Sequence, residues 1–438
     1  MLVHKVDFIP LKVLWFYIVL GVSLSFWGPI MYEGYDKLSV YAYMLSFLML
    51  FSLGYILAFI NNDSQADWVD STYQNFKQQK VMFWVKISIV SIFLVQLVTL
   101  LLGVVGGELN LSISKMGKAY VDMYTDYERG TGNISIVFLV QIFTYIPYLV
   151  SLILGAYYFK ELPRKYKIMV IFIYLSIVLI ETIGHGKQKQ LGDLFIFLSI
   201  ALLLKVDLLN KKMRKKLFKT LYVFAVVCIS ALVSILYFRY SAIGINVENI
   251  NEKTNPLMEY DLDHTIFHVF GDEIGFPLTV FTGYLSQGYY GLSLSLQQSF
   301  EWTYMVGNSY SLSILLQRYF GVPVDFHSTY SYRASVATGW DDSKWSTVFV
   351  WYAGDITFLG TLILFALIAF LYAKVWREAY RYKNPISIIL FSMLTIALLY
   401  IPANNQIMHT PGSIIAIFFF IILWIFKHKK FNFYKIDT

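Results

Sequence analysis

The chain has 438 residues, of which 57% are hydrophobic and only 14% are charged, and its net charge is +7. A soluble domain is about 45–50% apolar and about 25% charged, so this composition excludes a soluble globular protein and favours an integral membrane protein. The single cysteine, Cys228, excludes both an internal disulfide and a cysteine-based metal site.

Apolar blocks along the chain predict membrane-spanning helices. Most blocks are roughly 17–25 residues long, which is the length that a helix needs to cross about 30 Å of hydrocarbon. The ten predicted spans, in chain order, are Val13–Ile30, Leu38–Ile60, Val81–Val105, Ile134–Tyr158, Ile168–Ile183, Leu191–Leu209, Leu217–Phe238, Val348–Lys374, Ile386–Ile401 and Ser413–Phe426. The first block is expected to be an uncleaved span, because no small-residue cleavage site follows it. The expected fold class is an all-α integral membrane protein of about ten transmembrane helices.

The basic residues predict how the spans are oriented. Short connections rich in Lys and Arg stay in the cytoplasm, and about two thirds of the 35 Lys and Arg residues are cytoplasmic when both termini are placed there. Residues 1–238 then form a seven-span bundle, residues 239–347 form one long external loop, and residues 348–438 form a three-span bundle. The net positive charge reflects this topology and contact with anionic lipid, so it does not indicate nucleic-acid binding.

The uncharged stretch Ile274–Leu296 lies inside the long loop. As an eleventh span it would move Arg377, Arg381 and the basic C-terminal run to the outer side, against the positive-inside rule. Its Gly, Ser, Gln and Tyr content suits a segment at the depth of the lipid headgroups. We therefore expect a re-entrant or interfacial element here, and short helices in the rest of the loop.

A short turn between the fifth and sixth spans, GHGKQKQLGD at Gly184–Asp193, places Lys187 and Lys189 at the predicted outer surface of the membrane. Topology alone favours lysines on the cytoplasmic side, so these two need another explanation. They can bind a lipid-linked diphosphate, because ammonium groups bind phosphate and stabilise negative charge on a leaving group. The alternative is that the two lysines only pair with Glu181 and Asp193.

Three arginines extend the same hypothesis. Arg239 directly follows the seventh span, and Arg318 and Arg333 lie further along the external loop. A guanidinium group presents a fork of five donors that can bind a phosphate through two of them. The alternative for Arg239 is an anchor at the membrane interface beside Tyr237 and Tyr240.

Residues for acid–base chemistry occur in the long loop, chiefly in DLDHTIFHVFGDE at Asp261–Glu273. His264 and His268 are four residues apart and are predicted to share one helix face. The stretch lacks the glutamate of an HExxH zinc helix, so neither a metal nor another cofactor is predicted. A solvated acidic helix is the alternative reading. The candidates for a catalytic general base are His327, His268, Asp272 and Glu273.

One carboxylate, Asp355 in WSTVFVWYAGDITFLG at Trp345–Gly360, lies about two turns inside the eighth predicted span. A carboxylate at such a depth costs free energy unless it is paired or functional. A salt bridge to an external cation is the simplest explanation.

The span layout, the long loop ahead of the last three spans, YLSQGYYGLSLSL at Tyr284–Leu296 and the stretch Trp345–Gly360 resemble the bacterial O-antigen and capsule repeat-unit polymerases (Wzy-type). This resemblance implies a multi-pass protein of the inner membrane with a periplasmic loop and cytoplasmic termini. It also implies that Lys187 or Lys189, together with Arg239, holds an undecaprenyl diphosphate. The related O-antigen ligases place a His-Asn pair in the long loop, and the nearest match here is Gly307–Asn308.

The activity implied by the resemblance is inverting glycosyl transfer, in which a hydroxyl of one lipid-linked repeat unit attacks the growing chain and undecaprenyl diphosphate leaves. The expected partners are undecaprenyl-diphosphate-linked oligosaccharides, membrane lipid and a chain-length-regulating membrane protein. A flippase for the same lipid-linked saccharides and an O-antigen ligase are the alternatives. A membrane acyltransferase is disfavoured, because the predicted spans hold no deeply placed histidine.

Overall fold

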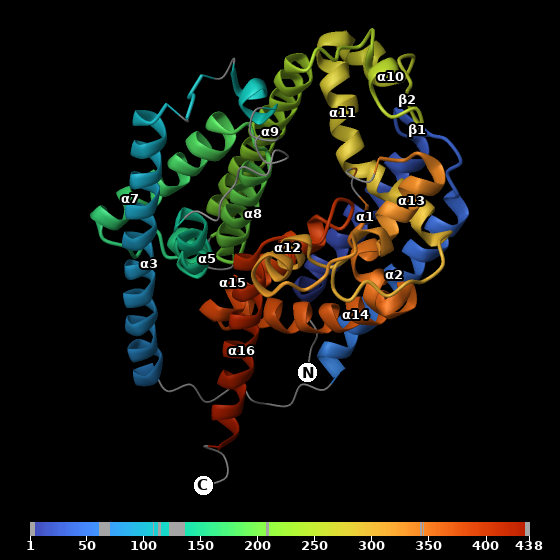
Figure 1. Cartoon of the computed structure of the whole chain (residues 1–438). Coiled ribbons are helices and arrows are strands. Elements are labelled where there is room, and N and C mark those ends of the chain that lie inside the picture. The colour runs from blue at the N-terminus through green and yellow to red at the C-terminus, as the bar shows by residue number, and fades with distance from the viewer. Residues whose placement is uncertain are drawn as a thin grey trace. The chain divides into compact units, whose positions relative to one another are not determined.

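The computed structural model describes residues 5–60, 71–107, 109–112, 115–121, 136–206, 210–341, 344 and 346–433. This part of the chain is mostly helical and contains one two-stranded sheet (Figure 1). It forms two compact units, each assembled from segments that are far apart in the sequence. Unit 1 comprises Met1–Asp63, Asn246–Arg377 and Met393–Ile417, and unit 2 comprises Ser64–Ile245, Glu378–Ser392 and Phe418–Thr438. This division reflects packing, whereas the three segments predicted from the sequence concern sidedness in a membrane and stay a prediction.

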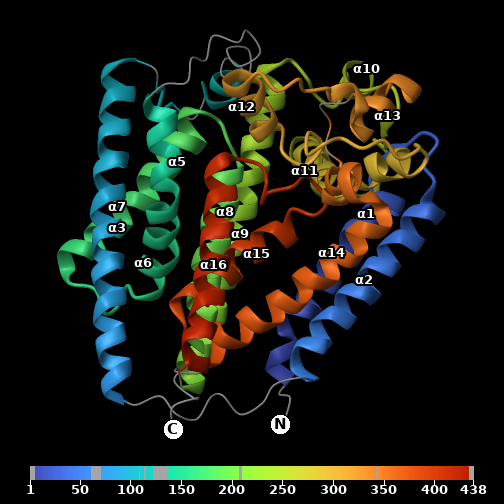
Figure 2. The same cartoon turned by 60° about the horizontal axis from the view of Figure 1, so that its bottom comes forward.

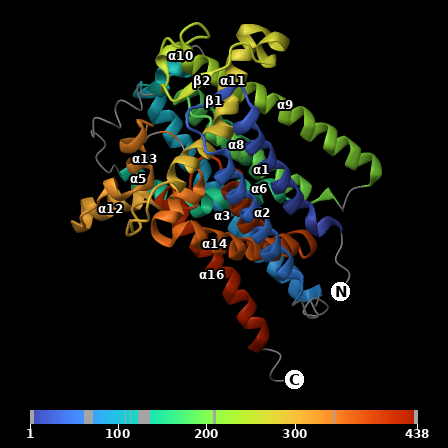
Figure 3. The same cartoon turned by 90° about the vertical axis from the view of Figure 1, so that its right-hand side faces the viewer.

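Unit 1 is built around α1 (Ile9–Trp27), α2 (Lys37–Ile60), α11 (Thr265–Leu296) and most of α14 (Val348–Arg381). Helix α1 packs against both α2 and α11, and Figure 3 shows α1 and α2 side by side. Glycine permits the close approach of these helices. A Cβ atom at Gly21 of α1 would lie 2.9 Å from the hydroxyl of Tyr289, and one at Gly54 of α2 would collide with the backbone carbonyl of Ala366.

The sheet of unit 1 joins two connections that are far apart in the sequence. Strands β1 (Ile30–Tyr32) and β2 (Met258–Tyr260) pair antiparallel, with Ile30 opposite Tyr260. Figure 3 shows the sheet beside α10 (Ile250–Lys253). Segments that pair in a sheet lie on the same side of a membrane, so the two connections share one side, and which side that is stays a prediction.

Unit 2 contains the helices of the predicted third to seventh spans. They are α3 (Ser71–Val105), α5 (Ile136–Leu149), the π-helix η3 (Val150–Leu154), α6 (Gly155–Tyr157), α7 (Arg164–Ile177), the π-helix η4 (Val178–Gly184), α8 (Lys189–Leu203) and α9 (Lys211–Ala242). Figures 1 and 2 both show α5 and α7 beside α3, and α8 packs on α9. The π-helices are wider than an α-helix and recur near functional sites. Here η4 leads directly into the turn that carries Lys187.

A helix lies at each of the ten predicted spans. Six helical stretches are long and apolar enough to cross a membrane: Val6–Trp27, Lys37–Ile60, Gln79–Val105, Arg164–Gly184, Lys211–Ala242 and Val348–Arg381. Three shorter apolar stretches are Ile142–Tyr157, Pro385–Leu399 and Pro411–Phe426. The last two belong to α15 (Pro385–Leu399) and α16 (Pro411–Phe433). The described chain is therefore a helical membrane protein, and the count of ten spans remains a prediction.

The sequence prediction for Ile274–Leu296 needs correction. The structure has a continuous helix here, the main part of α11, and not a re-entrant element that reverses direction, whereas the interfacial location stays a prediction. The backbone break lies earlier, at Gly271, where φ is +67°. The glycines and serines of this stretch allow close packing, since Gly275, Gly283, Ser286 and Gly288 are among the buried residues of the helix.

The rest of the long loop carries short helices, as the sequence predicted. These are α12 (Tyr310–Phe320), the 3₁₀-helix η6 (Phe326–Ser328) and α13 (Tyr330–Thr338). Helix α13 packs against α11 within unit 1.

Candidate functional site

Arg239 lies in the last turn of α9 and is held by an aromatic ring. Its guanidinium carbon lies 3.4 Å from the centroid of the Tyr120 ring. Tyr120 belongs to a short helical segment, residues 115–121, that precedes α5 in the chain. A guanidinium group stacks well on an aromatic face because it is planar and delocalised, and its donors point outward in its own plane. The ring therefore fixes the plane of Arg239 and leaves the donors directed away from the stacking contact.

Both lysines of the turn after η4 form ion pairs. The Nζ atom of Lys187 lies 3.0 Å from Glu181, and that of Lys189 lies 2.5 Å from Asp193. Burial acts to lower the pKa of Lys189, but the combined effects of Asp193, Tyr145 and Glu181 outweigh it, so the pKa lies above its ordinary value. The structure thus contains the pairing that was the alternative reading of this turn. Each lysine side chain is still about one third exposed, at 34% and 35%.

The turn and the end of α9 contact the same short segment, residues 115–121. Gly186 of the turn has φ of +65°, and a Cβ atom there would lie 2.5 Å from the carbonyl oxygen of Met116 and 2.8 Å from Cβ of Tyr120. On the other side, Gly117 of the segment packs against the carbonyl of Phe238 in α9. Only glycine fits at residue 186, because the conformation and the space both exclude a side chain.

We call the cations on these three elements the basic cluster. It consists of Lys115 and Lys118, which are exposed on the short segment, with Lys187, Lys189 and Arg239. The sequence pointed to the last three, whereas Lys115, Lys118 and Tyr120 were missed as site residues. The available signal was that Lys115 and Lys118 are two further lysines on the predicted external side, where topology disfavours them.

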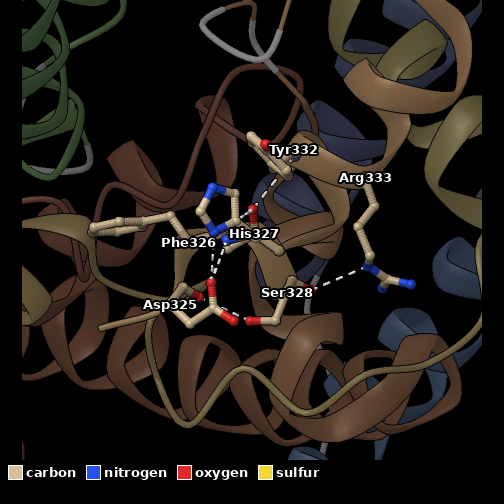
Figure 4. A network of polar contacts seen from close by, with 7 residues as sticks. Asp325, Phe326, His327, Ser328, Tyr332 and Arg333 are labelled. Carbon is tan, nitrogen blue, oxygen red and sulfur yellow. Dashed lines mark hydrogen bonds and ion pairs between the residues drawn. The ribbon is translucent and has the colours of Figure 1, made fainter. Parts of the chain in front are cut away.

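His327 of η6, in unit 1, forms a pair with a carboxylate. Its Nδ1 atom lies 3.0 Å from Oδ1 of Asp325, which also accepts a hydrogen bond from the His327 backbone at 2.9 Å (Figure 4). Both side chains are open to solvent, with 72% and 69% of their surface exposed. When Nδ1 donates to the carboxylate, Nε2 is the unprotonated nitrogen and can accept a proton. This arrangement suits a general base.

Arg333 of α13 is engaged by neighbouring protein groups. Its Nη1 donates to the carbonyl of Ser299 at 2.8 Å and lies 3.2 Å from the carboxylate of Glu301, and its Nε donates to the carbonyl of Ser328. Figure 4 shows the side chain of Arg333 reaching Ser328, the neighbour of His327. These bonds link residues 299–301 to the segment of His327, so Arg333 mainly holds unit 1 together at this point. The side chain of Arg318, in α12, lies outside the described residues.

The other predicted acid–base residues lie at the start of α11. His264 is the N-cap of the helix and accepts a hydrogen bond from the backbone of Ile266 at 3.2 Å. The prediction that His264 and His268 share a helix face is therefore wrong, because His264 precedes the helix. His268, Asp272 and Glu273 are exposed, and the break at Gly271 separates His268 from the two carboxylates. In the described parts of the chain, no group of His, Cys, Asp and Glu side chains has the arrangement of a metal site.

Asp355 lies just before a break in α14, at Thr357, where φ is +65°. Its carboxylate accepts hydrogen bonds from the hydroxyl of Thr303 at 2.9 Å, from the backbone of Met305 at 2.8 Å and from the amide of Asn308. Its partners among the described residues are thus neutral donors and not the cation that the sequence suggested. Asn308, in the stretch compared with the ligase His-Asn pair, is buried and donates one of these hydrogen bonds.

Comparisons with protein-family models, with curated proteins and with solved structures found no match to this chain. The functional assignment consequently depends on the residues themselves. The described site residues divide between the units, with the basic cluster in unit 2 and the groups around His327 and Asp355 in unit 1.

Proposed function

We propose that this protein joins undecaprenyl-diphosphate-linked oligosaccharide repeat units into O-antigen or capsular polysaccharide. It would act as a glycosyltransferase at the periplasmic face of the bacterial inner membrane, with both termini in the cytoplasm. The observation that carries the proposal is the convergence of the Lys187 turn and Arg239 on the segment of Tyr120. These are the two elements that the resemblance to the repeat-unit polymerases associates with the diphosphate.

The basic cluster has the chemistry that the departing diphosphate requires. Breaking the glycosidic bond transfers negative charge to undecaprenyl diphosphate, and fixed cations lower the barrier by stabilising that charge. Arg239 is already oriented by Tyr120, so little reorganisation is needed when the charge develops. The ion pairs of Lys187 and Lys189 hold the two ammonium groups in place and leave about a third of each side chain exposed. No divalent metal is needed in this scheme.

The second requirement is a base for the hydroxyl that attacks the anomeric carbon. Within unit 1, His327 has the chemistry for this role, because Asp325 orients its ring and stabilises the imidazolium that forms after proton transfer. The proton passes from the sugar hydroxyl to Nε2 of His327 as the new glycosidic bond forms, and the diphosphate leaves with the electrons of the old bond.

The test is a polysaccharide gel from a producing strain that lacks the gene and is complemented with variants. Wild type should restore the polymer ladder, and Arg239→Ala should leave only a single repeat unit at normal protein level. Lys253→Ala is a matched control, since Lys253 is an exposed cation of the same long loop outside the basic cluster. Loss of every capped form, including the single unit, would instead identify a ligase or a flippase. A normal ladder from Arg239→Ala would remove Arg239 from the site.

A further inference from the structure

A turn at Thr303–Val306 has an unusual sequence for its conformation. Tyr304 and Met305 have φ of +49° and +72°, and the backbone of Val306 donates to the carbonyl of Thr303 at 2.9 Å. Two central residues with positive φ and this hydrogen bond are the marks of a type I′ turn, whose central positions favour Asn and Gly. A bulky residue with positive φ is a conformational outlier, and such outliers concentrate at functional sites.

The turn is held in this conformation by the broken part of α14. Asp355 accepts hydrogen bonds from the side chain of Thr303 and the backbone of Met305. The carbonyl of Gly354 accepts the backbone N–H of Thr303 at 2.9 Å. Gly354 also lies so close to Thr303 that a Cβ atom would approach its side chain to 2.8 Å. Several contacts therefore fix a conformation that the turn residues themselves disfavour.

The result is a pair of aromatic rings displayed on the surface of unit 1. The rings of Trp302 and Tyr304 are stacked, with centroids 4.5 Å apart and planes 27° from parallel. Their exposed fractions are 56% and 73%. Large rings normally turn inward to bury apolar area, so a strained turn that presents two of them outward calls for a binding partner.

We propose that Trp302 and Tyr304 form an aromatic platform that binds the face of a sugar ring in the saccharide chain. The C–H groups on the apolar face of a pyranose carry partial positive charge and stack against the negative face of an aromatic ring. Glu301, which precedes the platform and is half exposed, accepts from Arg333 at 3.2 Å and has a second oxygen that can accept from sugar hydroxyls. This inference rests on the proposed function for the identity of the saccharide.

The same contacts link the platform to the proposed base. Arg333 donates to the carbonyls of Ser299 and Ser328, which flank the platform and His327 respectively. A sugar ring seated on Trp302 would thus be held by a part of unit 1 that is braced against the His327 segment. Asp355 acts here as a positioning residue, since it holds the turn and not the sugar.

The main competing role for exposed Trp and Tyr in a membrane protein is anchoring at the lipid interface. Two double variants separate the roles. Trp302→Phe with Tyr304→Phe keeps both aromatic faces, whereas Trp302→Leu with Tyr304→Leu keeps only apolar area. A sugar platform tolerates the first change and not the second, while a lipid anchor is served about equally by both. Trp27→Leu is the matched control, since Trp27 ends α1 and is 77% exposed.

Binding is measured by calorimetry with full-length protein in nanodiscs and saccharides released by mild acid from the producing bacterium's own polysaccharide. We expect the Leu pair to bind roughly 10-fold more weakly or worse, and the Phe pair and Trp27→Leu to stay within about threefold of wild type. Equal binding by the Leu pair and wild type, equal losses in the Leu and Phe pairs, or no binding by wild type would overturn the platform.

A parallel assay of the elongation of lipid-linked repeat units distinguishes failure of the platform from failure of the proposed function. If wild type binds saccharide through the platform but never elongates repeat units, the platform is supported and the polymerase function is excluded. If the Leu pair elongates repeat units with an unchanged KM, the polymerase function is supported and the platform is excluded.

Discussion

Replacing Asp355 with Ala should release the Thr303–Val306 turn. The substitution removes the acceptor of three hydrogen bonds, and two of its donors, Thr303 and Asn308, are almost fully buried. A hydrogen bond to a charged group contributes about 1.5–3 kcal/mol. Because the carboxylate is partly exposed and water replaces some bonds, we expect a local loss on the order of 3–5 kcal/mol, with the cost of positive φ at Tyr304 and Met305 no longer offset.

Hydrogen exchange measures this loss where it occurs. A peptide covering Thr303–Ser309 should exchange about 100-fold faster or more in Asp355→Ala than in wild type, since 1.4 kcal/mol corresponds to roughly tenfold. Thr303→Val removes one donor and should give a smaller acceleration of about tenfold. Asp325→Ala, at a carboxylate that is mostly exposed, is the control and should leave this peptide unchanged. If Asp355→Ala leaves exchange at the wild-type rate, the carboxylate does not hold the turn.

Four further predictions concern the proposed reaction and topology. Arg239→Ala should lower the rate of elongation about 100- to 1000-fold, and Arg239→Lys should recover it in part, because lysine keeps the charge but not the two-pronged geometry; equal activity of the Lys variant and wild type would favour a simple interfacial anchor. His327→Gln should reduce kcat about 100-fold or more with little change in KM, and a normal kcat would exclude it as the base. Elongation should persist in excess chelator, whereas activity that vanishes and returns with one added metal would contradict the scheme. A reporter fused after Lys430 should be cytoplasmic and one inserted near Lys253 periplasmic, and the reverse result would invert the topology.

The sequence predicted the helices well because a backbone in lipid can satisfy its hydrogen bonds in few ways. Without water, every backbone group must bond within its own segment, so a long apolar block such as Leu38–Ile60 becomes a helix whatever its detailed sequence. The observed helix, Lys37–Ile60, differs by one residue. The roles of side chains near helix ends were less predictable. His264 has the four-residue spacing from His268 that predicts a shared helix face, but it caps the helix. Its side chain accepts a hydrogen bond from the backbone of Ile266, and such local bonds compete with helix extension.

Contacts between distant segments account for most of what the sequence did not show. Tyr120 stacks on Arg239, more than a hundred residues later in the chain, and nothing near either residue indicates the other. The same holds for β1 and β2, which are only three residues long each and too short to give a strand pattern. The ion pairs of Lys187 and Lys189 were foreseeable, because their acidic partners lie six and four residues away.

The sequence identified Asp355 as an unusual residue but did not indicate which groups bind its carboxylate. The carboxylate stood out because it interrupts an apolar stretch, and a cation was the expected partner. The structure satisfies it with neutral donors from a turn 50 residues earlier, whose conformation is itself unfavourable for Tyr304 and Met305. The donors of Thr303 and Asn308 need an acceptor because they are buried, and these donors in turn stabilise the Asp355 carboxylate within an otherwise apolar stretch. The Thr303–Val306 turn and the Asp355 carboxylate each cost free energy without the other. Their pairing therefore depends on the folded chain and could not be predicted from either segment by itself.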